Sequence, residues 1–166
     1  IDMATAYGTS LGLNTTGLLL ALLLTQIVAF PASLTFAVLS KTKDTASLIK
    51  VAIIAYFLIA LFAVQLDKQW EFWVLAVAVG CFQGGIQALS RSYFAKIIPE
   101  NASGEYFGLF DICGKGASFL GTMLIGVVTQ ITGKQNLGVA ALSIMFVIGY
   151  LIFNKVSKMD ESSRRK

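Results

Sequence analysis

Polar side chains recur at helical spacing along one apolar stretch of the sequence, and two of them are charged. Asp111, Lys115, Ser118, Thr122 and Thr129 follow one another at steps of 4, 3, 4 and 7 residues. At 3.6 residues per turn, these steps place all five side chains on one face of a helix, called here the polar stripe. Asp111 and Lys115 are one turn apart on this face and can form an ion pair.

Lys115 is the residue of the polar stripe that says most about function. If Glu105 marks a membrane surface, Lys115 lies about 15 Å along the helix from it. A lysine at that depth is costly unless it is paired or hydrated. Two interpretations are open: an Asp111–Lys115 ion pair with only a structural role, or a solute pathway in which Lys115 attracts an anionic group. We favour the pathway, because charges inside a membrane usually serve a function.

The preceding apolar stretch carries a second polar face. Gln83, Gln87 and Arg91 are spaced four residues apart, and Gln83 lies about 16 Å along from Phe72, near the middle of a membrane. A glutamine there needs a hydrogen-bond partner, which can be another helix or a substrate, and both interpretations stay open. The adjacent face carries small residues at the same spacing, which favours close helix packing: Gly80, Gly84 and Ala88.

A further polar face precedes these two. Gln26 and Ser33 are seven residues apart, with Pro31 between them. Proline frees a backbone carbonyl and bends a helix, and such a bend can serve gating or be static. Gln26 is therefore a further candidate for a substrate pathway.

Composition indicates that a membrane positions these residues. Of the 166 residues, 56% are hydrophobic and 13% are charged, against about 25% charged residues in a soluble domain. Five apolar runs are long enough to cross a bilayer as helices: Thr16–Leu39, Leu48–Leu66, Trp70–Ser90, Tyr106–Ile131 and Leu137–Asn154. The opening run, Ile1–Tyr7, is too short to span and is interpreted as the end of a sixth helix, in a chain taken as a fragment of a longer protein. The predicted fold class is therefore all-α, a polytopic transmembrane helix bundle over residues 1–155, followed by a disordered tail over residues 156–166.

The connections between these runs differ in charge. Basic residues gather in alternate connections and in the tail, whereas the other connections hold only Lys68 and Lys134. The positive-inside rule therefore places the C-terminus in the cytoplasm. This topology explains the net charge of +4. The lipid bilayer is therefore the expected partner, and no nucleic acid is expected. The second and fifth runs are almost wholly aliphatic and aromatic and can face lipid, whereas the other three should face protein or a water-filled cavity.

The sequence lacks the residues that several classes of enzyme and metal site require. The sequence contains no histidine and no paired carboxylates within a span, which argues against an enzyme. Cys81 and Cys113 lie in apolar runs without metal-ligand spacing, so neither a disulfide nor a metal site is expected. No cofactor is expected either, because the sequence has no phosphate-binding loop.

The segments Gly84–Pro99, Gly104–Asp111 and Gly114–Ala117 resemble the major facilitator superfamily, and more narrowly its Atg22-like group. The resemblance implies the C-terminal half of a twelve-helix permease, from the end of helix seven to helix twelve, facing the N-terminal half of the same permease. It also implies a secondary transporter for small solutes, amino acids among them, that works by alternating access. In that fold helices nine and twelve face lipid, which agrees with the polarity of the runs.

The resemblance also directs attention to the cytoplasmic loops. The loop Ser40–Ala46 lacks the glycine and arginine typical of the superfamily, which argues against a gating latch there. Arg91 and Glu105 flank the next loop and are candidates for a cytoplasmic gate, or else two solvated charges. The lack of long loops and extra domains favours a bacterial inner-membrane protein. The alternative function is a non-transporting membrane scaffold, which predicts that Lys115 is buried against protein with no cavity beside the polar stripe.

Overall fold

The described part of the protein is entirely helical. The structure, a computed structural model, describes residues 9, 12, 14–65, 68–99 and 102–164. Its helices are α2 (Thr15–Thr42), α3 (Thr45–Val64), α4 (Gln69–Ile97), α5 (Ser103–Thr132) and α6 (Gln135–Arg164). Five segments among them are long and apolar enough to cross a membrane. The predicted helical bundle is thereby confirmed, while the predicted end of a sixth helix at Ile1–Tyr7 lies outside the described residues.

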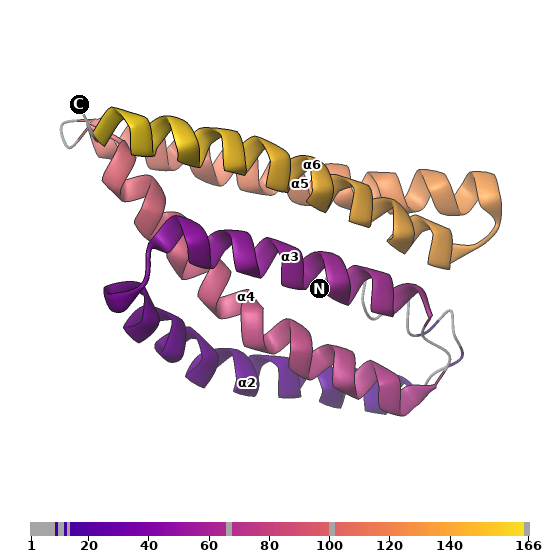
Figure 1. The fold of residues 1–166 in the computed structure, drawn as a ribbon. Helices are drawn as coiled ribbons and strands as arrows, with labels where there is room; N and C mark the ends of the chain where they lie inside the picture. The colour runs from indigo at the N-terminus through magenta and orange to yellow at the C-terminus, as the bar shows by residue number, and fades with distance from the viewer. Residues whose placement is uncertain (1–8, 10–11, 13, 66–67, 100–101, 165–166) are drawn as a thin grey trace.

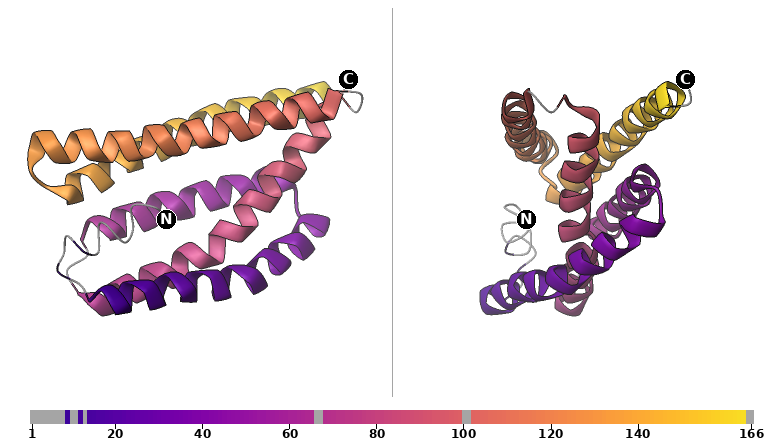
Figure 2. Two further views of the ribbon diagram at one scale, coloured as in Figure 1. Left: turned by 180° about the vertical axis from the view of Figure 1, so that it is seen from behind. Right: turned by 90° about the vertical axis from the view of Figure 1, so that its left-hand side faces the viewer.

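The helices run alternately in opposite directions and pack in an order that differs from the chain order (Figure 1). α2 packs on α4, α4 on α3, α3 on α6, and α6 on α5. α4 crosses obliquely between α2 and the α5–α6 pair, as both views of Figure 2 show. The ends of α2, α4 and α6 therefore lie at one end of the bundle together with the starts of α3 and α5, and we call this the basic end because it holds Lys41, Lys43, Lys96, Lys155 and Lys158.

Capping side chains, a proline and a glycine set where several of the helices begin and end. The Asn14 side chain accepts a hydrogen bond from the Thr16 N–H (3.0 Å), and Asp44 accepts one from the Ser47 N–H (3.0 Å), so each caps a helix start. α4 stops before Pro99, because the residue preceding a proline disfavours helical geometry. α5 ends at Gly133, whose φ of 70° is the left-handed conformation that glycine adopts freely.

Small residues let α2 and α4 approach closely. A Cβ added at Gly80 would lie 2.7 Å from the Thr25 carbonyl oxygen, and one at Gly84 would lie 2.9 Å from that of Ala29. The buried Thr25 hydroxyl donates to the Ala21 carbonyl (2.9 Å) and lies 3.2 Å from the Ala76 carbonyl of α4. The packing role predicted for this face is confirmed at Gly80 and Gly84, whereas Ala88 is exposed.

The last helix extends past the predicted span and into the predicted tail. α6 continues through residues 156–164, part of the tail for which disorder was predicted. The Tyr93 hydroxyl of α4 donates to the Asp160 carboxylate (2.9 Å), the Tyr93 ring packs edge-on against Phe153, and Ser157 is only 8% exposed. These contacts join α6 to α4 near the basic end, and they depend on a partner 67 positions away in sequence, which a local composition cannot reveal.

Candidate functional site

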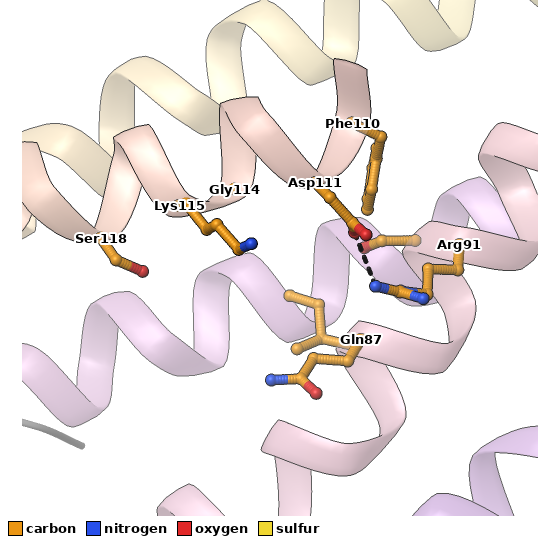
Figure 3. A pocket seen from close by; sticks show the side chains of 9 residues that line it. Gln87, Arg91, Phe110, Asp111, Gly114, Lys115 and Ser118 are labelled. Carbon is orange, nitrogen blue, oxygen red and sulfur yellow. Dashed lines mark hydrogen bonds and ion pairs between the residues drawn. The ribbon is translucent and has the colours of Figure 1, made fainter. Parts of the chain in front are cut away.

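α4 and α5 flank a cleft of about 600 Å³ in the half of the bundle nearer the basic end. Two turns of each helix line it (Figure 3): Ile86, Gln87, Ser90 and Arg91 from α4, and Phe110, Asp111, Gly114, Lys115 and Ser118 from α5. Five of the sequence-predicted site residues meet here, namely Gln87, Arg91, Asp111, Lys115 and Ser118.

Contacts at two separate points hold α5 beside this cleft. Near its start, the Phe107 and Phe110 rings pack against Phe94 of α4, with ring centroids 5.6 and 4.9 Å apart. Near its end, α5 approaches α6 so closely that a Cβ at Gly138 would lie 2.9 Å from the Ile125 carbonyl oxygen. The segment between these two contacts keeps its polar stripe uncovered, and residues 111–120 are all exposed.

An ion pair between α4 and α5 closes one side of the cleft. The Arg91 guanidinium donates to the Asp111 carboxylate across 2.7 Å, and the two side chains are 59% and 52% exposed. Among the described residues, this pair replaces both the Asp111–Lys115 and the Arg91–Glu105 pairs that the sequence suggested. The reason is geometric: the end of α4 approaches the start of α5 here, so the long Arg91 side chain reaches the Asp111 carboxylate directly.

Lys115 extends into the space between the helices. Figure 3 shows its ammonium group on the same side of α5 as the Ser118 hydroxyl, facing α4, from which the Gln87 amide projects. No described carboxylate lies within 4.0 Å of the Lys115 ammonium. With Asp111 held by Arg91, the cleft therefore presents one cation that is not neutralised, beside an amide and a hydroxyl. This set can bind a small solute that carries an anionic group.

Four predicted site residues lie outside the cleft lining. Gln83 shares the face of Gln87, but its Oε1 is buried and has no hydrogen-bond partner among the described residues. The Thr122 hydroxyl donates within its own helix, to the Phe119 carbonyl (2.9 Å). Gln26 of α2 and Glu105 of α5 are exposed away from the cleft.

The structure adds Ile86, Ser90, Phe110 and Gly114 to the predicted lining. Each lies one, three or four positions from a predicted residue, so extending the helical spacing to apolar and small neighbours would have found them. Gly114 matters most, since nothing lies within 4 Å of where its Cβ would be, and the missing side chain widens the cleft between Asp111 and Ser118. Within the described part of the chain, no three His, Cys, Asp or Glu side chains gather as metal ligands.

Nearly the whole chain matches a known protein family. The family described as vacuole effluxer Atg22 like matches residues 3–165, nearly the whole chain. The chain belongs to this Atg22-like family. It is 43% identical over 152 residues to a Bacillus subtilis protein named "Uncharacterized MFS-type transporter YxiO", which covers 92% of the chain and 36% of the relative.

Fungal relatives are similar over a shorter stretch. Autophagy-related protein 22 of Eremothecium gossypii is 34% identical over 57% of the chain and 19% of its own length, and that of Candida glabrata is 36% identical over 55% and 17%. The Atg22-like chain thus spans about a third, or less, of the length of these curated relatives. No solved structure gives a significant match.

Proposed function

We propose that this chain forms one wall of the solute pathway of a secondary transporter, which moves small solutes, amino acids among them, by alternating access. One observation carries the proposal: Lys115 lies exposed in the α4–α5 cleft, with no carboxylate beside it among the described residues. A cation placed within a membrane-spanning helix is costly, and an aqueous pathway together with a transient anionic ligand offsets that cost.

The proposed binding mode follows from the groups around Lys115. The anionic group of the solute, a carboxylate in an amino acid, accepts hydrogen bonds from the Lys115 ammonium and the Ser118 hydroxyl. Gln87 offers an amide from the opposite helix. The ammonium group of a zwitterion would share the Asp111 carboxylate with Arg91, since a carboxylate has about four acceptor positions. The N-terminal half of the permease supplies the opposing wall.

The Arg91–Asp111 pair is the proposed gate at the basic end. It takes the place of the Arg91–Glu105 gate suggested by the sequence, because Arg91 contacts Asp111 and Glu105 is exposed outside the cleft. The basic end faces the cytoplasm under the positive-inside rule, in a bacterial inner membrane. Solute entry from that side requires the pair to separate, and its exposure keeps the separation inexpensive.

The alternative function, a non-transporting scaffold, makes a different demand on the same residue. It requires Lys115 to be buried against protein with no cavity beside the polar stripe. The exposure of Lys115 and the 600 Å³ cleft beside it favour the transporter instead.

Uptake by the full-length protein tests the proposal. Radiolabelled amino acids are offered to proteoliposomes that contain wild type, Lys115→Ala or Lys134→Ala, the last being a matched control in the loop at the opposite end of the bundle. We expect saturable uptake that falls at least tenfold in Lys115→Ala and is kept in Lys134→Ala, with both variants inserted and folded. Uptake that survives in Lys115→Ala would make Lys115 structural and contradict the proposed pathway.

A further inference from the structure

A second polar pocket lies at the basic end, away from the α4–α5 cleft. It has a volume of about 330 Å³ and is bounded by the start of α3, the end of α4 and the end of α6. Its charged lining residues are Asp44, Lys50, Lys96 and Asp160. Two cations and two anions in one small pocket cancel each other, so simple attraction of an anion does not describe it.

The pocket contains unused hydrogen-bond donors. Ser157 is only 8% exposed, and no described group accepts from or donates to its hydroxyl. Thr45 and Ala46, each 5% exposed, carry the first two N–H groups of α3, which have no acceptor within the helix. The Lys50 ammonium has no ion-pair partner in the described chain, and Lys96 makes only one long hydrogen bond, to the Thr45 hydroxyl (3.5 Å). Donors converging at a helix start suit a phosphate group.

The carboxylates in the pocket point to a second charge on the ligand. Asp44 accepts from the Ser47 N–H and hydroxyl, and Asp160 accepts from the Tyr93 hydroxyl. A carboxylate offers about four acceptor positions, so both can also receive an ammonium group. A phosphate and an ammonium carried by one headgroup match the two lysines and the two aspartates of this pocket.

An apolar crevice of about 430 Å³ adjoins the polar pocket through Tyr93, which lines both. The side chains that line it include Ile53, Phe94, Met145, Phe146, Phe153 and Val156. On α6 it extends from Met145 to Val156, roughly 16 Å along the helix axis, whereas the polar pocket begins one residue later at Ser157. Polar groups thus lie at the basic end of the bundle and apolar groups lie towards its middle. A lipid has the same order, with a polar headgroup followed by an apolar chain.

The depth of the pocket agrees with this order. α3 has 20 residues, about 30 Å, so it just crosses the hydrocarbon core of a bilayer. Its start at Thr45 therefore lies at headgroup level. We propose that the polar pocket and the apolar crevice together bind one aminophospholipid. Its phosphate lies at Lys50, Lys96 and the start of α3, and its ammonium group lies at Asp44 and Asp160. One acyl chain of the lipid lies in the apolar crevice.

Native mass spectrometry of the delipidated full-length protein, titrated with phosphatidylethanolamine, tests this proposal. We expect one tightly held lipid, and an affinity about thirtyfold lower in Lys50→Gln/Lys96→Gln, since a partly exposed pair between a lysine and a phosphate contributes up to about 1 kcal/mol. The matched control Lys43→Gln/Lys158→Gln changes the same charge at the same end outside the pocket. Equal loss in both double variants would overturn the proposal.

A second variant and two other ligands test the acyl chain and the headgroup independently. Nothing lies within 4 Å of a Cβ at Gly149, which lines the crevice, so Gly149→Leu should fill this space without disturbing the fold and lower the affinity for the lipid. Glycerophosphoethanolamine, which has the headgroup but no chains, should bind much more weakly than the lipid. Equal binding of that compound would reduce the site to a headgroup pocket, and tighter binding of phosphatidylglycerol would remove the role of the aspartates. Either result would overturn the proposal.

Discussion

Arg91 and Asp111, 20 positions apart in the sequence, meet across α4 and α5 with 2.7 Å between guanidinium nitrogen and carboxylate oxygen. The contact joins the end of one polar face to the start of another. It also leaves Lys115, one turn further along α5, without a carboxylate among the described residues. One ion pair thus sets the charge balance of the cleft, and it adds a polar contact to the aromatic contacts of Phe94 between the two helices.

Exchanging the two charges tests this contact. Arg91→Asp and Asp111→Arg each place like charges together and should slow uptake, whereas the double variant Arg91→Asp/Asp111→Arg should recover part of it. The recovery should correspond to a coupling of about 1 kcal/mol, roughly fivefold in rate, because the pair is half exposed. Glu105→Arg is the control, and a loss there as large as in Asp111→Arg would favour the Arg91–Glu105 gate instead.

The close approach of α2 and α4 makes a prediction about stability. A Cβ at Gly84 would lie 2.9 Å from a backbone carbonyl oxygen, which cannot move cheaply, so Gly84→Ala should lower the free energy of unfolding by about 1–3 kcal/mol. Gly108→Ala is the matched control, since no atom lies within 4 Å of its Cβ. It should be neutral or stabilise by up to about 1 kcal/mol, because alanine favours helix. Thermal unfolding in detergent measures both, and equal shifts would refute the packing.

The anchoring of α6 by Tyr93 can be measured through proteolysis. Tyr93→Phe removes the hydrogen bond to the Asp160 carboxylate, and a bond to a charged group contributes about 1.5–3 kcal/mol. The end of α6 should open more often, so trypsin should cleave after the exposed Lys158 about tenfold faster or more. Tyr106→Phe, a change at an exposed tyrosine of α5, should leave the cleavage rate unchanged. A rate in Tyr93→Phe equal to wild type would show that other contacts hold this segment.

Most of the fold could be predicted from the sequence, because each span is a long apolar run. The polar stripe from Asp111 to Ser118 could also be predicted, because helical spacing is regular. It did not predict which charges would pair. Asp111 has Lys115 one turn away and Arg91 on another helix, and only the approach of the end of α4 to the start of α5 decides between these two partners. The stripe also divides beyond Ser118: Thr129 turns towards α6, where its hydroxyl lies 2.7 Å from a Cβ position at Gly138. At the basic end α6 continues past the predicted apolar run, where it is held by the Tyr93–Asp160 contact between residues remote in sequence.

Filling the cleft without removing any charge gives the sharpest test of where a solute passes. Gly114 lines the cleft and Gly116 does not, although the two are two residues apart on α5 and neither would place a Cβ within 4 Å of another group. Gly114→Leu should therefore fold as well as Gly116→Leu and place its side chain between Asp111 and Ser118. We expect Gly114→Leu to reduce uptake at least tenfold by blocking access to Lys115, while Gly116→Leu keeps more than half of it. If both variants transport equally well with normal insertion, the solute does not pass between α4 and α5, and the role of Lys115 would have to be structural.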